Sequence, residues 1–490
     1  MSLTRKVAYN TIVQIVGKVI TTLISLVLVA SLTRHLGVSG FGQYTTIFAY
    51  LAFFGVFADF GFFWIFVREI AKPDADIDKA TSNILTLRTV VGIAVFGLAT
   101  LIAIFVPQYD GFRLGIGITA LASLFQALNS TYVGVFQNKL RMDKAAMTDV
   151  IGRAVILILT LYLIKQNYGL NLILWAYAIG NMINFFASAY LGKIYVHFRP
   201  TFDFKYWWEL FRQAVPMGIV LVLGLIYFKI DSVMLSLMKT STDIGIYGPP
   251  YKVLEIFQFL PAIFMGNVFP IMTRYILTKD ERLQNVLQKA FDFLTILGWP
   301  LVVGTIFTAT RIIRIVAGQE FVTAHTIPPV LGLPATSPTA LQILVCAVGL
   351  SFISYMFGYL VIALGKQSKM IWPYVILVFF NVIANFILIP HYSYIGAAAV
   401  TVMTEILVLV FSWRVAHKYL EIKLSLVILW KVLFASVFLG VFLYFTADSL
   451  NIILLMVLAA LVYGVALYAV GGINQEMFTS LLPGKKTETE

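Results

Sequence analysis

The sequence predicts an all-α polytopic membrane protein of about 14 transmembrane helices, with two six-helix lobes in parallel repeat around a central cleft and two additional C-terminal helices. Composition is the first reason: 60% of the 490 residues are apolar, only 12% are charged, and the mean hydropathy is +0.90. Soluble domains are about half apolar and about a quarter charged, so a water-soluble fold is excluded. Regularly spaced apolar stretches and an internal repeat are the other reasons. Cys346 is the single cysteine, which excludes an intrachain disulfide scaffold.

Fourteen apolar stretches are long enough to cross a bilayer, whose core of about 30 Å needs about 20 residues of helix. The first is longer than the apolar region of about 7–15 residues in a secretory signal peptide, so it is interpreted as a span. The predicted spans are 9–32, 42–67, 84–106, 113–136, 147–164, 171–191, 213–237, 246–272, 291–310, 340–364, 370–390, 393–413, 426–446 and 451–471.

Lysine and arginine residues are distributed unequally between the two sides of this map. The N-terminus, the loops after even-numbered spans and the C-terminal tail carry 25, with Arg88 counted among them, whereas the opposite loops carry six. By the positive-inside rule, both termini are predicted to be cytoplasmic and the protein to lie in the cytoplasmic membrane. The net charge of +12 is therefore expected to face anionic lipid headgroups rather than nucleic acid.

The chain is predicted to contain two copies of a six-span unit. Gly42 matches Gly245 at an offset of 203 residues, and Gly134 matches Gly358 at an offset of 224. Six is an even number, so both copies have the same orientation, as in transporters built from parallel repeats. The predicted organisation is an N-terminal lobe at 1–196, an interfacial linker at 197–212, a C-terminal lobe at 213–420, and two helices with a cytoplasmic tail at 421–490.

Ionisable side chains inside the spans are candidates for function, because each costs about 2.5–3.5 kcal/mol to insert and so faces a partner or a water-filled cavity. At a rise of about 1.5 Å per residue, four of them on four helices lie about 14–18 Å from the cytoplasmic side, and Lys229 lies near the midplane. The four residues in this layer are Lys18, Asp59, Arg153 and Glu405. The remaining candidates are Asp149, Lys229, Asp231, Lys252 and Glu255.

Two pairs among these residues can neutralise each other on one helix face. Asp149 and Arg153 are spaced i, i+4, and Lys252 and Glu255 are spaced i, i+3. A purely structural ion pair is one interpretation in each case, and a role in substrate binding or coupling is the other.

Two lysines have no acidic partner within a turn on their own helix face. Lys18 and Lys229 are therefore interpreted as anion-binding groups in the cleft. The alternative is a salt bridge between helices, for which Lys18 and Asp59 form the obvious pair.

No catalytic, cofactor or metal site is predicted. Asp74, Asp76 and Asp78 form a D-x-D-x-D run, but lysines flank it in a short loop, and it is interpreted as a solvated loop. The five histidines are not spaced as metal ligands, and no phosphate-binding or nucleophile motif appears. Because no loop exceeds about thirty residues, there is no room for an ATPase domain, and transport would use an ion gradient, the membrane potential or the substrate gradient.

Short motifs around the first, second, seventh and eighth spans carry a family resemblance. The first span contains Gly17-Lys18, the second closes with Ala58-Asp59-Phe60-Gly61, the seventh carries Lys229-Ile230-Asp231, and the eighth carries Tyr251-Lys252 and Glu255. In this order and spacing, over essentially the whole chain, the sequence resembles the polysaccharide (O-antigen type) flippase family of the multidrug/oligosaccharidyl-lipid/polysaccharide flippase superfamily.

The resemblance implies twelve core helices in two lobes, with two extra helices here as in many members. It implies a non-enzymatic transporter, without a cofactor, that turns a polyprenyl-pyrophosphate-linked oligosaccharide from the inner to the outer leaflet by alternating access. Expected partners are this lipid-linked oligosaccharide, membrane lipids, H⁺ or Na⁺ as the coupling ion, and a polysaccharide polymerase and glycosyltransferases, but no nucleic acid. The predicted substrate-binding residues are Lys18, Lys229, Lys252 and Arg153, and the predicted coupling or gating residues are Asp59, Asp231, Glu255 and Glu405.

The few cations of the first span favour a capsule, O-antigen or exopolysaccharide unit over lipid II as the substrate. A cation-coupled drug antiporter of the same superfamily is the alternative, although its cavity should be dominated by carboxylates, whereas lysines accompany the acids here. An integral-membrane glycosyltransferase is a third class, but the short loops supply no donor-binding domain.

Overall fold

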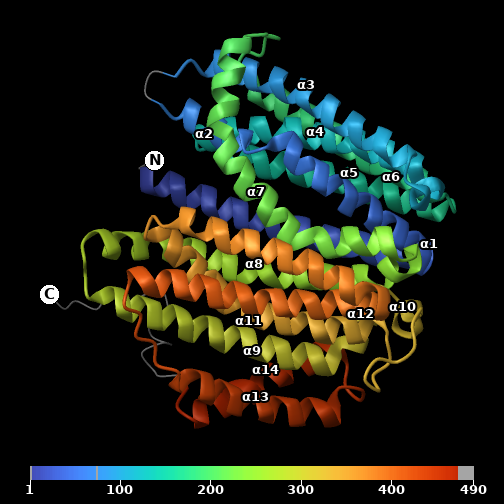
Figure 1. The fold of residues 1–490 in the computed structure, drawn as a ribbon, viewed down its shortest axis with the longest axis vertical. Coiled ribbons are helices and arrows are strands. Elements are labelled where there is room, and N and C mark those ends of the chain that lie inside the picture. Colours follow the sequence, from blue (N-terminus) through green and yellow to red (C-terminus); the bar gives the residue numbers. More distant parts are fainter. Residues whose placement is uncertain (1–2, 73–74, 473–490) are drawn as a thin grey trace. The chain divides into compact units, whose positions relative to one another are not determined.

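The computed structural model describes residues 3–72 and 75–472, which form helices and short connections (Figure 1). Apart from an isolated bridge between Val330 and Leu333, these residues contain no β-structure. Asp74 of the aspartate run and the C-terminal tail with Lys485 and Lys486 lie outside the described residues. The elements are α1 (Leu3–Asp59), α2 (Phe62–Ile70), α3 (Ile77–Ile104), η1 (Pro107–Phe112), α4 (Arg113–Asn138), α5 (Met142–Lys165), α6 (Leu170–Gly192), α7 (Phe204–Met238), α8 (Ser241–Leu277), α9 (Arg282–Val316), α10 (Gln319–Thr323), α11 (Ser337–Ala363), η2 (Gln367–Met370), α12 (Ile371–Tyr419), α13 (Val427–Thr446) and α14 (Ile452–Ala469).

The predicted all-α polytopic membrane fold is confirmed. Within the described residues, twelve helical segments are long and apolar enough to cross a membrane. Two of them, at 16–70 and 367–419, have 55 and 53 residues, about twice the length that one crossing needs. Non-helical backbone divides α1 at Gly37 (φ 64°) and α12 at Ser393 (φ 45°), so the twelve segments provide fourteen crossings.

The second predicted span is not continuous. We expected one helix over 42–67, but α1 ends at Asp59, and Phe60 (φ 38°) and Gly61 (φ 85°) are left-handed before α2 begins. Glycine adopts this conformation without a steric penalty. A Cβ on Gly61 would also lie 3.1 Å from Cβ of Met217 on α7, so the break is packed closely against that helix. As a result, Asp59 occupies the end of a helix inside the membrane-spanning part of the chain.

Two other helix boundaries differ from the prediction because helices continue beyond their apolar stretches. Helix α7 begins at Phe204, within the predicted interfacial linker at 197–212 and before the predicted span at 213–237, and Oδ1 of Asp203 accepts a hydrogen bond from the Tyr206 amide at 3.1 Å. An aspartate in this position satisfies an amide at the helix start that has no partner within the helix. Likewise α9 extends to Val316 and α10 follows, which shortens the loop between the predicted spans 291–310 and 340–364.

The described chain divides into two compact units. The first comprises the described residues within 1–248 and 316–320, and the second comprises the described residues within 249–315 and 321–490. The division falls within α8, where Pro249 and Pro250 follow Gly248, and each proline lacks the amide donor of a helical hydrogen bond. In the first unit, α3, α4, α5 and α6 lie side by side (Figure 1), with buried apolar clusters between the helices.

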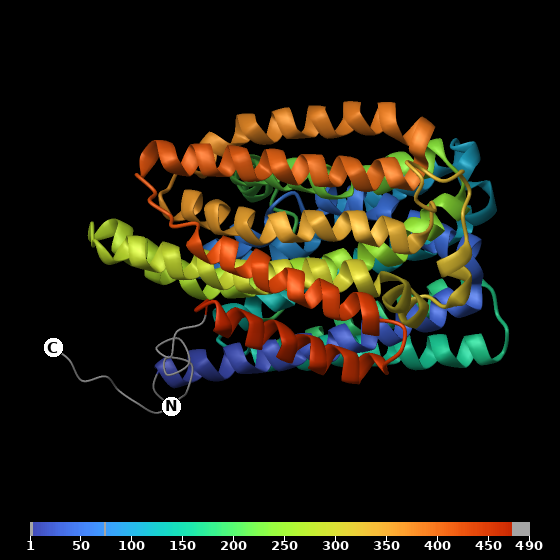
Figure 2. The ribbon, with the colours of Figure 1, turned by 90° about the horizontal axis from the view of Figure 1, so that it is seen from below.

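In the second unit, α11 packs against α12, and α13 packs beside α14 (Figure 2). Large apolar side chains of α13 remain exposed, among them Trp430 at 70% and Val437 at 62%. Apolar residues on the outer faces of spanning helices are expected to contact lipid.

A reciprocal close contact within the first unit joins positions that the predicted internal repeat relates. Any side chain on Gly42 of α1 would overlap the carbonyl oxygen of Ser241 on α8, and any side chain on Gly245 would overlap the carbonyl oxygen of Val38. The offset of 203 residues relates Val38 to Ser241 and Gly42 to Gly245, so the two contacts are equivalent.

Candidate functional site

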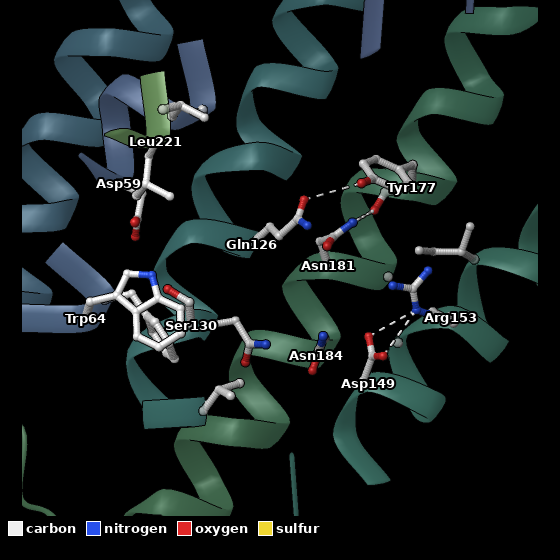
Figure 3. A pocket seen from close by; sticks show the side chains of 18 residues that line it. Asp59, Trp64, Gln126, Ser130, Asp149, Arg153, Tyr177, Asn181, Asn184 and Leu221 are labelled. Atoms are coloured by element: carbon white, nitrogen blue, oxygen red, sulfur yellow. Dashed lines mark hydrogen bonds and ion pairs between the residues drawn. The ribbon is translucent and has the colours of Figure 1, made fainter. Parts of the chain in front are cut away.

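The first unit contains a cavity of about 520 Å³ among its membrane-spanning helices (Figure 3). Four helices contribute residues at helical spacing: Asp149, Gly152, Arg153 and Ile156 of α5, for example, follow i, i+3, i+4, i+7 and therefore share one face. The lining residues are Gly55, Val56 and Asp59 of α1, Phe63 and Trp64 of α2, Gln126, Asn129, Ser130 and Val133 of α4, the four residues of α5, Tyr177, Gly180, Asn181 and Asn184 of α6, and Leu221 of α7.

Two glycines bring α5 and α6 into close contact at the cavity wall. A Cβ on Gly152 would lie 2.8 Å from Cβ of Asn184 and 3.0 Å from the carbonyl oxygen of Gly180. A Cβ on Gly180 would lie 2.8 Å from the carbonyl oxygen of Gly152. Small residues permit this approach between membrane helices, and here it places the charged face of α5 beside the amides of α6.

One side of the cavity is formed by an ion pair between Asp59 and Arg88. Arg88 of α3 donates from Nη2 to Oδ1 of Asp59. The guanidinium is almost completely buried, with 1% of its side chain exposed, whereas 29% of the Asp59 side chain is exposed. The carboxylate points into the cavity (Figure 3), and its Oδ2 accepts no hydrogen bond from residues 3–72 or 75–472.

Arg88 is held in place by three further acceptors on α4. Its Nη1 donates to the carbonyl oxygen of Ala127 at 3.0 Å, to Oγ1 of Thr131 at 3.2 Å and to Oγ of Ser130. Its Nε is buried and lacks a partner in the described part of the chain. Arg88 was not predicted as a site residue because its charge was assigned to the cytoplasmic side. Arg88 lies eleven residues into α3, about 16 Å from the helix start, a depth that matches the predicted depth of Asp59.

The opposite side of the cavity carries the second ion pair. Nε of Arg153 lies 3.1 Å from Oδ1 and 3.2 Å from Oδ2 of Asp149 (Figure 3), as the i, i+4 spacing predicted. Nη1 of Arg153 also donates to Oγ of Ser25 on α1 at 3.3 Å. Both members of the pair line the cavity, so they form part of its polar wall.

Amide side chains and three aromatic residues, Phe63, Trp64 and Tyr177, complete the wall. The Tyr177 hydroxyl lies 3.4 Å from Oε1 of Gln126, and Nδ2 of Asn181 donates to the carbonyl oxygen of Tyr177 at 2.9 Å (Figure 3). Nearby, Oδ1 of Asn129 and Oδ1 of Asn184 are buried and have no hydrogen-bond partner among the described residues. These amides are not ionisable and were therefore not predicted as site residues, although they recur at helical spacing in apolar spans.

The other sequence-predicted residues of the first unit do not line this cavity. Lys18 of α1 is exposed, and its neighbour Gly17 packs closely against Ala146 of α5. On α7, the ammonium of Lys229 lies 5.4 Å from the ring centre of Phe228.

Asp231, also on α7, is 4% exposed and belongs to a buried hydrogen-bond network in the first unit. Its Oδ2 accepts from the Tyr247 hydroxyl at 2.6 Å, and its Oδ1 accepts from the amide of Ser232 at 2.6 Å.

Three predicted residues belong to the second unit. Nζ of Lys252 lies 2.8 Å from Oε2 of Glu255, so the i, i+3 pair is formed. Glu405 is 4% exposed, and it lies close enough to Tyr355 and Tyr374 to interact with them electrostatically. Of the eight predicted site residues, the cavity of the first unit thus contains Asp59 and Arg153.

The cavity is suited to polar but uncharged groups. Two carboxylates and two guanidiniums compensate each other, and the remaining polar groups are amides, hydroxyls and an indole. In the described part of the chain, no cluster of three or more histidine, cysteine or acidic side chains is arranged to hold a metal ion. The arrangement supports hydrogen bonding to a ligand.

Comparisons with known proteins give a consistent result. The family model described as "Polysaccharide biosynthesis protein" matches residues 7–276. The chain is 21% identical over 374 residues to the probable low-salt glycan biosynthesis flippase Agl15 of Haloferax volcanii, covering 76% of this chain and 75% of that protein. It is 23% identical over 303 residues to the capsular polysaccharide biosynthesis protein CapF of Staphylococcus aureus, covering 60% and 72%.

The fold is similar to a solved structure of the lipid II flippase MurJ in an inward closed conformation. The TM-score is 0.74 at 16% sequence identity, and the match covers 97% of this chain and 99% of that one. At this identity, the similarity establishes the fold.

Proposed function

The chain belongs to the polysaccharide biosynthesis protein family, and we propose that it is a flippase that moves a polyprenyl-pyrophosphate-linked oligosaccharide across the cytoplasmic membrane. The oligosaccharide is a polysaccharide repeat unit, and alternating access driven by an H⁺ or Na⁺ gradient moves it from the inner to the outer leaflet. Glycosyltransferases would supply this substrate, and a polymerase would consume it.

The observation that carries the proposal is the polar cavity within membrane-spanning helices of a member of this family. Polar side chains in a lipid-embedded segment are unfavourable unless they face a partner or a water-filled space. Here five helices direct polar groups to one such space, and the described residues around it form no cluster of three or more histidine, cysteine or acidic side chains that could hold a metal ion. Binding and passage of a polar headgroup account for such a cavity better than catalysis does.

The pyrophosphate would be bound by lysines outside this cavity. We propose Lys18, Lys229 and Lys252 for this role, because an anion crossing a low-dielectric region requires cations along its path. Replacing Lys18 or Lys229 with glutamine should abolish complementation of a flippase-deficient strain at normal protein levels, and arginine should partly restore it because it keeps the charge. Full complementation by a variant with glutamine at both positions would refute this assignment.

The proposed orientation places both termini in the cytoplasm. Reporter fusions after residues 108, 242 and 448 should all report the outer side, since these positions lie in η1, in the first turn of α8 and between α13 and α14. A cytoplasmic signal at any one of them would contradict the orientation.

The decisive experiment is reconstitution of the purified protein in liposomes with a fluorescent polyprenyl-pyrophosphate oligosaccharide. A membrane-impermeant quencher then reports the fraction of substrate in the outer leaflet over time. We expect the labelled substrate of the inner leaflet to become accessible to the quencher over time in liposomes that contain the protein, but not in empty liposomes. Transport of a cationic dye, with no movement of the lipid-linked oligosaccharide, would instead identify a drug antiporter.

A further inference from the structure

We propose that the cavity of the first unit is a saccharide-binding site for an uncharged, hydroxyl-rich sugar ring of the transported glycan. The inference rests on the proposed function and assigns the sugar to residues other than the lysines. It is drawn from the juxtaposition of two compensated ion pairs, a group of amides and the aromatic rings of Trp64 and Tyr177 around one space of about 520 Å³.

The two ion pairs leave the cavity without net charge. Asp59 is paired with the buried Arg88, and Asp149 is paired with Arg153. An organic cation would require carboxylates without a partner, and a pyrophosphate would require guanidinium or ammonium groups without a partner. The described lining of this cavity offers neither, so a neutral polar ligand fits it best.

Hydrogen-bonding capacity is the second argument. Asparagine and glutamine side chains carry both a donor and an acceptor, which matches sugar hydroxyls that also donate and accept. The amide oxygens of Asn129 and Asn184 are buried without a partner within the described residues, and Oδ2 of Asp59 accepts no bond from them. A buried acceptor without a donor is unfavourable, and the hydroxyls of a bound sugar would supply the donors.

Aromatic rings are the third argument. Trp64 of α2 lines the cavity with 51% of its surface exposed, and Tyr177 of α6 lies across from it (Figure 3). Flat, apolar ring faces pack against the C–H faces of a pyranose, while the polar edge of the sugar bonds to amides and carboxylates. The left-handed break at Phe60 and Gly61 starts α2 and so positions Trp64 beside Asp59.

The size of the cavity also agrees with a small ligand. Small-molecule sites have volumes of about 300–1,000 Å³, and this cavity lies within that range. It would accommodate a sugar ring and its substituents, with the pyrophosphate and the polyprenyl chain remaining outside.

A steric variant tests the inference without removing any polar group. A Cβ on Gly55, which lines the cavity, would meet no atom within 4 Å, so Gly55→Leu would extend into the open space. Gly97 of α3 also has no atom within 4 Å and lies outside the lining, so Gly97→Leu is the matched control. Trp64→Leu is the second variant, and Trp208→Leu, at a residue 61% exposed at the start of α7, is its control.

The measurement is saturation-transfer difference NMR of the purified full chain with glucose, galactose or N-acetylglucosamine at millimolar concentrations. We expect saturable transfer to at least one of these sugars in the wild type and both controls. The signal should disappear in Gly55→Leu, and binding should weaken by about tenfold in Trp64→Leu. Thermal unfolding of each variant establishes that the protein is folded.

Two results would overturn the inference: no saturable transfer to any of the three sugars in the wild type, or unchanged transfer in a folded Gly55→Leu protein. Either result leaves the proposed function open, because flipping of the lipid-linked oligosaccharide is measured separately in liposomes. Conversely, wild-type protein that binds sugar but moves no lipid-linked oligosaccharide would refute the flippase and leave the saccharide site in place.

Discussion

Replacing Asp59 with leucine should strongly destabilise the protein, because it leaves the Arg88 guanidinium buried without its carboxylate. Arg88 is 1% exposed and retains only the neutral acceptors of Ala127, Ser130 and Thr131. Removing one partner of a buried ion pair costs about 3–5 kcal/mol, since the remaining charge is uncompensated. We therefore expect the free energy of unfolding to fall by about 3–5 kcal/mol.

Arg88→Met should cost less than Asp59→Leu. The Asp59 side chain is 29% exposed toward the cavity, so water can solvate the carboxylate once the guanidinium is absent. The free energy of unfolding should then fall only by the contribution of hydrogen bonds from a charged donor, about 1.5–3 kcal/mol. The double variant contains neither charge, so its cost should be smaller than the sum of the two single costs by about 2 kcal/mol.

The assay is reversible unfolding in mixed detergent micelles, monitored by tryptophan fluorescence, for the wild type, both single variants and the double variant. The exposed pair of Arg141 and Asp143, whose side chains are 46% and 26% exposed, provides matched substitutions Arg141→Met and Asp143→Leu. A mostly solvated pair contributes about 0–1 kcal/mol, so its cycle should show little coupling. Additive costs at Asp59 and Arg88, or a smaller cost for Asp59→Leu than for Arg88→Met, would refute the reasoning.

Two further predictions concern stability. Gly42→Ala should sharply lower the unfolding temperature and the yield of folded protein, because its Cβ would overlap the Ser241 carbonyl. Gly97→Ala is the control and should be neutral or slightly stabilising. Equal unfolding temperatures for the two variants would show that the close contact relaxes without cost. Tyr247→Phe should lower the free energy of unfolding by about 1.5–3 kcal/mol, because it removes a hydrogen-bond donor from the buried Asp231 carboxylate. Tyr468→Phe, at an exposed tyrosine, is the control. A loss below about 0.5 kcal/mol in Tyr247→Phe would mean that Asp231 finds another donor.

Hydropathy alone was sufficient to predict the helical membrane fold and most of its crossings. The transfer free energy of about 20 apolar residues dominates the placement of each helix, and this quantity is local to the sequence. The division of α1 near Gly37 follows from the same pattern, because the apolar stretches before and after it are separate. By contrast, the break at Phe60 and Gly61 lies within an apolar stretch and depends on packing against Met217, which hydropathy does not describe.

The candidate site was only partly predictable for a similar reason. Asp149 and Arg153 lie on one helix face, so their pairing follows from local spacing. Asp59 and Arg88 are on different helices, and their pairing depends on how α1, α3 and α4 pack. A comparison of depth along the helices would have placed both residues in one layer, but choosing Arg88 over Lys18 as a partner requires the tertiary structure.

The partner of Asp59 bears directly on ion coupling. The sequence predicts Asp59 to be a coupling or gating residue, and it offers Lys18 as the obvious partner of Asp59 in a salt bridge between helices. An arginine is protonated at all accessible pH values, and its fork binds a carboxylate more specifically than an ammonium does. A proton or Na⁺ at Asp59 would therefore have to displace the permanent, buried cation Arg88. This geometry favours a structural and ligand-binding role for Asp59 and directs the coupling hypothesis to Glu405, which is 4% exposed in the second unit.

We expect Asp59→Asn and Glu405→Gln to differ in liposomes with an imposed pH or Na⁺ gradient. Both substitutions keep the side-chain shape and remove the charge. Asp59→Asn should retain the acceleration of flipping by the gradient, whereas Glu405→Gln should lose the acceleration and keep the slow exchange seen without a gradient. The ratio of rates with and without the gradient is the measured quantity, because it is insensitive to differences in the amount of active protein. The opposite pattern, with acceleration lost in Asp59→Asn and kept in Glu405→Gln, would mean that the Asp59–Arg88 pair opens during transport and that Asp59 is the coupling residue.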